Sequence, residues 1–517
     1  MTDPISEAIG EPASEAVAVE PSTSAIDGKP KPRQQPSLDL VLAREERNDL
    51  GNARRFIARH GADLIDVERI GALCWDGKRY AADLADSEWA KRAHDTTVSL
   101  YDEALALRDA GPWPPSEEEE KETDSQIKEK LQQKRERAWN SWVGKGKEFA
   151  QFCGNASRLQ AMVSVARPYL KRSAADMDPD PWLFNCQNGV LDLRQRPETR
   201  GQMRLQPHNR EFRITKISGV AFDPKATCPT FDKFLEDILP DEAVRLYVQR
   251  FFGYCLTGVT SEQTFTIFYG RGKNGKSTLV DVIRRVIGDY GVTVPVEQFL
   301  DVDRRNADAP NPTMARLIKA RAAFVSEPSK SASLSEHLVK EVTGGEPIQI
   351  RNLHERPVEF LPEFKALMQT NHKPRIGGDD IGIWRRIVMI AFQTTIPENK
   401  RIPNFIERLS DELPGILNWM LDGLFQWHER GLDPPSEIQS FIEEYRRESD
   451  LIGEFLDAET HEIADGRVQA SALYDAYTRW CAKNAIDPIK ASPFGKKMRA
   501  RVSKVVKSMG VIPYALG

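Results

Sequence analysis

The pattern of hydrophobic and polar positions divides the 517-residue chain into segments of different character. Residues 1–38 are rich in Pro, Ser, Glu and Ala and contain few large apolar side chains. Such a segment cannot bury enough surface to offset the entropy of ordering, so we predict a disordered tail. Residues 39–225 predict a mostly helical α+β domain, in which a helix and a strand precede a hairpin with Asp76 and Gly77 at its turn.

Short β-branched or aromatic runs alternate with helical spacing from 226 to 400, which predicts a parallel sheet with helical crossovers. Residues 401–447 have helical spacing and form the expected connector. The order helix, short link, helix, basic stretch and apolar strand over 448–517 is typical of a winged helix. The acidic stretch at 111–124 interrupts helical segments, and we expect a solvated loop there.

Composition narrows the class of protein. The chain is 40% hydrophobic and 29% charged with a mean hydropathy of -0.50, and it contains no apolar run long enough to span a membrane. Its first residues lack the basic start and apolar core of a secretion signal, so we expect a cytoplasmic location, in a bacterial host cell. The six cysteines include no C-x-x-C pair, which favours buried reduced thiols over disulfides or zinc.

The formal charge of -5 is unevenly distributed. Acid is concentrated in Pro115–Asp124, whereas Lys490–Gly517 contains seven Lys or Arg and no acid. A basic helix suits the phosphate backbone of DNA, and local patches matter more than net charge for such binding. A merely solvated basic face is the alternative. The DNA-binding candidates in this segment are Lys496, Lys497, Arg499 and Arg501.

The stretch "YGRGKNGKST" fits the pattern G-x-x-x-x-G-K-[ST], between the apolar run "TFTIF" and a helix that we expect to end at Gly288. In this pattern Lys276 would reach the β and γ phosphates, and the Ser277 hydroxyl would ligate Mg²⁺. The alternative is a glycine-rich turn with an incidental lysine. We predict binding of ATP with Mg²⁺. The residues expected to bind the phosphates are Gly270, Gly272, Lys273, Asn274, Gly275, Lys276, Ser277 and Thr278.

Two later strands end in polar residues at the edge where a triphosphate would bind. "RAAFVSE" ends in Glu327, a candidate for ordering Mg²⁺ or polarising the attacking water, while Ser326 stands where many such enzymes carry a second acid. "FKALMQTN" ends in Asn371, a candidate for sensing the γ phosphate. The alternatives are that Glu327 is an ordinary surface acid and that Asn371 only forms a turn. Arg385 and Arg386 stand just before another strand. They are either two solvated cations, or one of them stabilises the γ phosphate bound by a neighbouring subunit.

Five motifs in order, "GRGKNGKST", "FVSE", "KEVTGGEPIQIRNLHERPVEFLPEF", "MQTNHKP" and "GIWRRIVMIAF", closely resemble the superfamily-three helicases, in particular the helicase half of phage, plasmid and poxvirus primase-helicases. Upstream, "WLFNCQNGVLDL" and "VQRFFGYCLTG" look like that family's lead-in, so the similarity covers roughly residues 45–515. It implies an AAA+-like P-loop motor domain, preceded by the α+β domain and followed by a winged-helix tail.

The resemblance also implies roles. Lys276 and Ser277 match the Walker A pair, and Glu327 matches the Walker B glutamate. Asn371 matches the sensor asparagine. Arg386 matches the arginine finger, with Arg385 as the second choice. Lys340 and "TGGE" open a motif whose following β-hairpin grips one DNA strand, and here that hairpin offers Arg351, His354 and Arg356.

From the resemblance we expect a replicative DNA helicase of phage or plasmid type. It would form a homo-oligomeric ring, a hexamer, act on single-stranded and forked DNA, and cooperate with a separate primase or polymerase. Residues 1–38 are too short for a primase domain, so we predict no primase activity. One alternative is a nucleotide-switched initiator or loader without unwinding activity. A small-molecule P-loop kinase is another, but it needs neither a hairpin nor an arginine from a neighbour.

Overall fold

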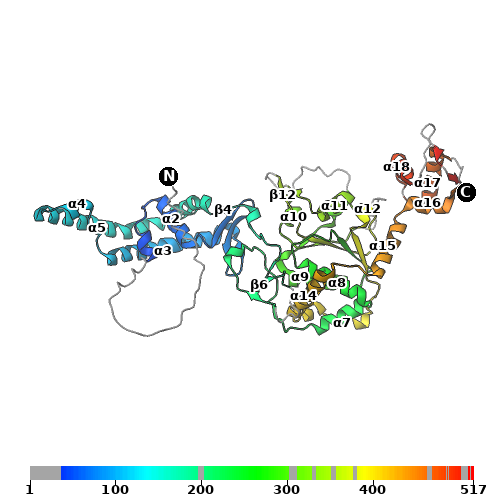
Figure 1. Cartoon of the computed structure of the whole chain (residues 1–517), viewed down its shortest axis with the longest axis horizontal. Helices are drawn as coiled ribbons and strands as arrows, with labels where there is room; N and C mark the ends of the chain where they lie inside the picture. The colour runs from blue at the N-terminus through cyan, green and yellow to red at the C-terminus, as the bar shows by residue number, and fades with distance from the viewer. Residues whose placement is uncertain are drawn as a thin grey trace. The chain divides into compact units, whose positions relative to one another are not determined.

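The computed structural model describes residues 37–195, 203–301, 311–328, 333–350, 357–376, 381–462, 468–484, 486, 488–501, 511–512 and 514–516. The predicted disordered tail therefore lies almost wholly outside the described residues. Contacts divide the chain into two compact units: residues 1–45 with 98–152, and residues 46–97 with 153–517. Helix α3 (Ser87–Ala110) contributes to both units (Figure 1).

The first unit is helical. Besides part of α3 it contains α1 (Leu38–Leu42), α4 (Glu117–Lys121) and α5 (Ser125–Cys153). Its apolar centre includes Leu107 and the edge-to-face pair Trp113–Trp139, with ring centroids 5.2 Å apart. The solvated loop expected at 111–124 is wrong in part, because α4 forms within it. Ser116 caps α4, and the buried Glu119 pairs with Arg135 at 3.1 Å, so one acid of the run stabilises a helix instead of facing solvent.

The second unit begins with a small α+β layer. A sheet of order β3-β2-β1-β4 packs against three helices, one of which is the start of α3. The predicted hairpin is confirmed, with Trp75 opposite Tyr80 and Gly77 at φ 97° in the turn. The elements are α2 (Asp49–His60), β1 (Leu64–Val67), β2 (Gly71–Trp75), β3 (Tyr80–Ala82), α6 (Ala156–Ala166) and β4 (Lys171–Arg172). A second sheet follows, with strands β5 (Leu183–Cys186), β6 (Gly189–Asp192) and β7 (Leu205–Gln206).

The predicted parallel sheet is confirmed. Its five strands run parallel in the order β14-β8-β13-β10-β9. Successive residues face opposite cores: Leu367 packs with α8, α9 and α14, and Met368 packs with α10, α11 and α12 on the other face (Figure 1). The strands are β8 (Phe265–Tyr269), β9 (Gly291–Val294), β10 (Ala322–Val325), β13 (Lys365–Thr370) and β14 (Ile387–Ala391).

Helices cover both faces of this sheet. Those on the first face are α7 (Pro229–Ile238), α8 (Glu242–Cys255), α9 (Lys276–Ile287), α13 (Phe405–Ser410) and α14 (Leu413–Arg430). Those on the second are α10 (Pro312–Ala315), α11 (Glu336–Thr343), α12 (Ile381–Trp384) and α15 (Ser436–Glu448). Strands β11 (Ile348–Ile350) and β12 (Val358–Phe360) follow β10 and precede β13 in the sequence, and they pair antiparallel. This pairing confirms the two strands of the predicted hairpin.

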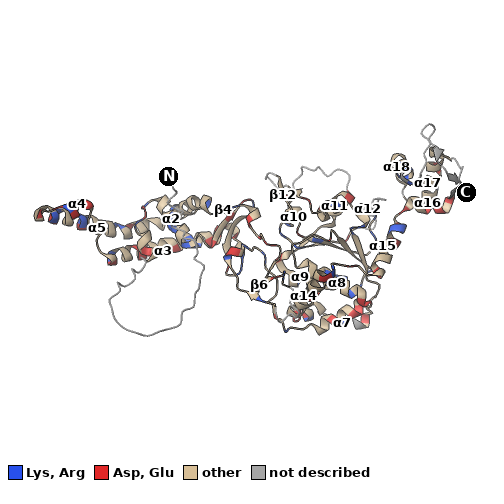
Figure 2. Cartoon of the chain, in the orientation of Figure 1, with Lys and Arg blue, Asp and Glu red and all other residues tan. Residues whose placement is uncertain are grey.

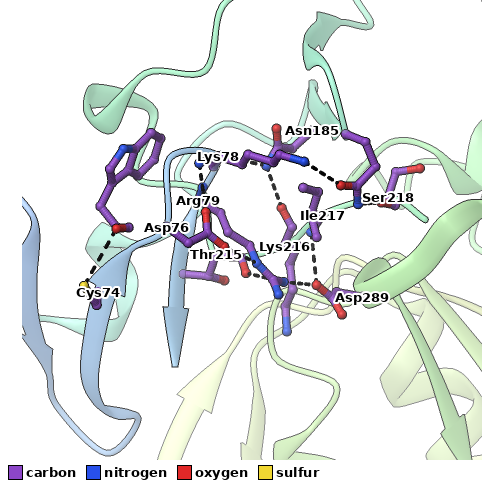
Figure 3. A network of polar contacts seen from close by, with 12 residues as sticks. Cys74, Asp76, Lys78, Arg79, Asn185, Thr215, Lys216, Ile217, Ser218 and Asp289 are labelled. Carbon is purple, nitrogen blue, oxygen red and sulfur yellow. Dashed lines mark hydrogen bonds and ion pairs between the residues drawn. The ribbon is translucent and has the colours of Figure 1, made fainter. Parts of the chain in front are cut away.

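A polar network joins the α+β layer to the sheet domain (Figure 3). The buried amide of Asn185 donates to the carbonyls of Lys78 and Lys216 at 3.1 and 3.0 Å, and Arg79 pairs with Asp289 just after α9. The end of α9 is held as well, because the Ser218 hydroxyl donates to the Val286 carbonyl at 2.6 Å. The helix that follows the glycine-rich loop is thereby anchored at its carboxyl end.

Two buried cations hold the amino edge of the sheet. The Arg321 guanidinium donates to the carbonyls of Leu183, at 2.6 Å, and Leu256, and lies 4.4 Å from the centre of the Tyr290 ring. Lys365 Nζ donates to the carbonyls of Thr257 and Val259. The carboxyl end of α8 is negative, so cations there are favourable. Burial nevertheless lowers the pKa of Lys365 to about 7.

The carboxyl-terminal segment has its own small core around Phe455, Tyr477 and Trp480. It contains α16 (Leu451–Glu459), α17 (Ala470–Lys483) and α18 (Ala491–Arg501). Two short antiparallel pairs accompany the helices: β15 (Thr460–Glu462) with β18 (Tyr514–Leu516), and β16 (Val468–Gln469) with β17 (Val511–Ile512). The winged-helix assignment stays a prediction.

Replacing Lys365 by Met should change how stability depends on pH. Between about pH 7 and pH 10 the unfolded chain keeps a proton that the folded chain has released, so wild-type stability gains from rising pH. The variant loses this gain. We expect the free energy of unfolding of wild type, minus that of the variant, to increase by up to about 1.4 kcal/mol per pH unit in this range, measured by urea unfolding. The exposed Lys225→Met variant is the control, and parallel curves for wild type and K365M would contradict the prediction.

Candidate nucleotide site

The glycine-rich loop connects β8, the second strand of the five-stranded sheet, to α9 and turns tightly. Gly272, Lys273 and Gly275 all have positive φ, at 92°, 54° and 83°. At Gly275 the space is also restricted, because a Cβ would lie 2.6 Å from Ile238 Cγ2 and 3.0 Å from the Phe234 ring. The loop therefore needs glycine at Gly275 for both backbone conformation and packing.

Lys276, the first residue of α9, carries a buried positive charge. Its ammonium donates to the Gly270 carbonyl at 2.6 Å, to Asn274 Oδ1 at 3.0 Å and to Asn371 Oδ1 at 3.2 Å. All three acceptors are neutral. Burial lowers the pKa of Lys276, and the Glu327 carboxylate opposes that shift. A buried cation with neutral partners is well placed to receive an anion.

The strand order brings the predicted polar residues together. Strand β13 lies between β8 and β10, so Asn371 at its end stands between Lys276 and Glu327. Its side chain accepts from Lys276, and its backbone N–H donates to Glu327 Oε1 at 2.9 Å. The Ser326 hydroxyl bonds outside this group of residues, because it accepts a hydrogen bond from the Val296 N–H at 2.9 Å. Glu327 itself is exposed.

The beginning of α9 fits a phosphate. No side chain caps this 12-residue helix, whereas Asp241 caps α8 by accepting from the Val244 N–H. Free N–H groups and the helix dipole favour an anion at such an end. Ser277 is exposed beside it, and Thr278 is half-buried. With a triphosphate bound, Ser277 and Glu327 would hold Mg²⁺, which neutralises phosphate charge.

The two arginines lie at the far end of the sheet from this loop. Ile387 pairs with Phe265 and Ala391 pairs with Tyr269, so residues 385 and 386 are separated from the loop by the length of β8, about 16 Å. The structure distinguishes them. The buried Arg386 donates to the Gly382 carbonyl at 2.6 Å, while Arg385 is exposed. Arg385 is thus the more accessible of the two, whereas the resemblance favoured Arg386, and the role of either stays a prediction.

The expected DNA contacts are described only in part. Arg351, His354 and Arg356 lie outside the described residues. Lys496, Lys497, Arg499 and Arg501 all lie on α18, where Figure 2 shows Lys and Arg. Arg501 also bonds to Asp450 Oδ1 at 2.5 Å, so its guanidinium contributes to the tail's own fold. Lys496 and Arg499 are exposed, whereas Lys497 is half-buried.

A cavity of about 340 Å³ opens beside β14, on the opposite side of β8 from Glu327. No sequence motif predicts this cavity, because it is formed by three segments that are distant in the chain. Its lining is mainly apolar and comes from the α7–α8 link, the end of β14 and α15: Leu239, Pro240, Asp241, Val244, Met389, Ala391, Gln393, Thr394, Glu437, Ile438 and Phe441.

Comparison with protein families gives two matches. The family "D5 N terminal like" matches residues 53–240, and a family of unknown function, DUF5906, matches residues 268–386. The chain is 27% identical over 299 residues to "Putative helicase L207/L206" of Acanthamoeba polyphaga mimivirus, and 23% identical over 333 residues to "Putative primase C962R" of African swine fever virus. These matches support the D5-like primase-helicase family.

The matches to D5-like proteins are partial. The aligned region covers 54% of this chain and 31% of the mimivirus protein, and 60% and 34% for the swine fever virus protein, so the chain spans about a third of their length. Both relatives are viral, and the bacterial host stays a prediction. The apo carboxyl-terminal region of NrS-1 is 13% identical with a TM-score of 0.35, covering 57% of this chain and 79% of that one. At that score the two folds are not equated.

Among the described residues, no helix is both long enough and apolar enough to cross a bilayer. They also contain no group of three or more His, Cys, Asp or Glu side chains arranged to hold a metal.

Alanine substitutions in the loop should separate backbone strain from crowding. At Gly272 nothing lies near a new Cβ, so Gly272→Ala costs only the left-handed conformation, about 1–2 kcal/mol. Gly275→Ala adds the clash with Ile238, about 1–3 kcal/mol more. Urea unfolding of both variants tests this ranking, and equal losses of stability would contradict it.

Proposed function

We propose that this protein is an ATP-dependent replicative DNA helicase that forms a ring and translocates on single-stranded DNA. The observation that carries the proposal is the buried Lys276 ammonium, held by neutral oxygens at the uncapped start of α9. The D5-like family match and the helicase name of the mimivirus relative support the same function. The absence of primase activity stays a prediction.

The bound nucleotide would extend across the end of β8. Its γ phosphate would lie toward Asn371 and Glu327, because both approach Lys276 from the β13 side. Its base would then lie on the β14 side, where the apolar cavity is large enough for a purine. Glu327 would orient the attacking water, and Asn371 would report the presence of the γ phosphate.

Ring assembly would supply, from a neighbouring subunit, an arginine that reaches the phosphate loop. Neither Arg385 nor Arg386 reaches its own phosphate loop, since the length of β8 separates them from it. We assign the finger in trans to Arg385 because it is exposed, and a structural role to the buried Arg386. ATP would then lie between subunits. The hairpin formed by β11 and β12, and α18 in the tail, would contact the DNA backbone.

A nucleotide-switched initiator or loader is the second candidate, because the tail's basic helix and the ATP site suit DNA binding as well as they suit movement. The two functions differ in one measurable respect. Only the helicase displaces a strand from a forked substrate. Assembly and DNA binding without displacement would favour the initiator.

Substitutions at two site residues should dissociate binding from turnover. Lys276→Ala should abolish binding of ATP, because the buried cation that receives the phosphates is gone. Glu327→Gln should keep binding but lower turnover by about 10²–10⁴-fold, since it loses the base that orients the water. Fluorescent-nucleotide binding and ATPase rates with and without single-stranded DNA measure both effects.

The outcome for wild type decides between classes of function. Turnover stimulated by single-stranded DNA, together with forked-substrate unwinding, supports the helicase. Turnover by a monomer that ignores DNA contradicts ring assembly and favours a small-molecule kinase. Tight ATP binding by Lys276→Ala would show that the loop is not the phosphate site.

Mixing subunits should test the shared site. Arg385→Ala assemblies should bind ATP normally and lose about 10³-fold or more in turnover, because transition-state charge is unstabilised. Rings mixed from Lys276→Ala and Arg385→Ala subunits should recover part of the activity at junctions where both residues are intact. Arg386→Ala should instead lower the melting temperature. No recovery in verified mixed assemblies would count against Arg385 acting across subunits.

A further inference from the structure

Asn274 is the one residue of the loop whose side chain is buried together with that of Lys276. Its side chain is only slightly exposed, at 3%. The amide bonds in two directions at once: Oδ1 accepts from Lys276 Nζ at 3.0 Å, and Nδ2 donates to the Phe392 carbonyl at 3.0 Å. The lysine is thus connected through one amide to the residue that follows β14.

The chain after β14 is attached to the loop at more than this point. Phe392 donates its N–H to the Tyr269 carbonyl at 2.7 Å, and Ile396 donates to the Lys273 carbonyl at 2.9 Å. With the Asn274 bond these contacts hold residues 392–396 along the loop. Strand β14 in turn belongs to the central sheet, so the anchor of Asn274 is rigid.

The loop's first glycine makes room for this bond. A Cβ at Gly270 would lie 2.2 Å from Asn274 Nδ2 and 2.5 Å from the Phe392 oxygen. Any other residue at Gly270 would displace one of the two bonded atoms. The glycine and the asparagine are therefore parts of one arrangement, in which the carbonyl of Gly270 also accepts from Lys276.

We propose that Asn274 is a positioning residue: anchored on the Phe392 carbonyl, its amide fixes the Lys276 ammonium where the terminal phosphates of ATP bind. This inference rests on the proposed function of the loop. The position requires a donor and an acceptor on one short planar group, which an asparagine side chain supplies. Aspartate keeps the acceptor but loses the donor to Phe392, and alanine loses both.

The test compares Asn274→Ala with Asn418→Ala. Asn418 is an apt control because it is also buried and its amide also donates to backbone carbonyls, those of Asp223 and Ala226 at 2.7 and 2.9 Å, away from the loop. Both variants should lose stability. Only N274A should lose about 10–100-fold in kcat/KM for ATP, since a displaced group near the reacting phosphate is costly. N418A should stay within about threefold of wild type.

A pH profile gives a readout that general destabilisation does not move. The alkaline limb of kcat/KM reports the free protein, where the Lys276 ammonium faces Asn274, Asn371, the Gly270 carbonyl and the charge of Glu327. Removing Asn274 Oδ1 takes away one partner of the charged form, so the limb should move to lower pH in N274A. In Asn274→Asp it should move to higher pH, because a carboxylate favours the ammonium.

The outcomes are separable. If wild type hydrolyses ATP and N274A matches N418A in kcat/KM and in pH profile, the positioning role alone is overturned. Wild type that neither binds nor hydrolyses ATP overturns the proposed function and this inference with it. A loss confined to N274A, with the alkaline limb displaced in opposite directions by alanine and aspartate, supports the role of Asn274.

Discussion

The site depends on keeping one ammonium group buried without a carboxylate bonded to it. An isolated buried charge is expensive, and the protein offsets that cost with oxygens from Gly270, Asn274 and Asn371. Glu327 influences the charge, and its bond to the Asn371 backbone keeps it near. A direct ion pair would neutralise the lysine and compete with phosphate. The neutral shell leaves the positive charge available to an anionic ligand.

Strand order makes that arrangement possible. Placing β13 between the loop strand and β10 puts an amide, rather than an acid, next to the lysine. It also leaves Glu327 one strand further away and exposed, where a metal or water can approach it. The cavity beside β14 lies on the other side of the loop, so phosphate chemistry and base recognition would occupy different sides of β8.

Local signals in the sequence predicted the strands and the helix around the site. Short β-branched or aromatic runs indicated the strands, and a glycine at each end of α9 indicated the helix. The strand ends also pointed to Glu327 and Asn371, whose roles stay predictions. Three features were out of reach because they depend on contacts between distant segments. The cavity combines residues around 240, 390 and 440, α4 forms where Glu119 meets Arg135, and only packing distinguishes Arg386 from its exposed neighbour.

The same elements connect the nucleotide site to the rest of the second unit. Helix α9 begins at Lys276 and ends where Ser218 and Asp289 attach the α+β layer, while β14 begins after Arg385 and ends at the Asn274 anchor. Helix α9 therefore connects the loop to the junction around Asn185, and the edge strand β14 connects it to the exposed Arg385. The loop of the candidate site is thus shared with two other parts of the second unit.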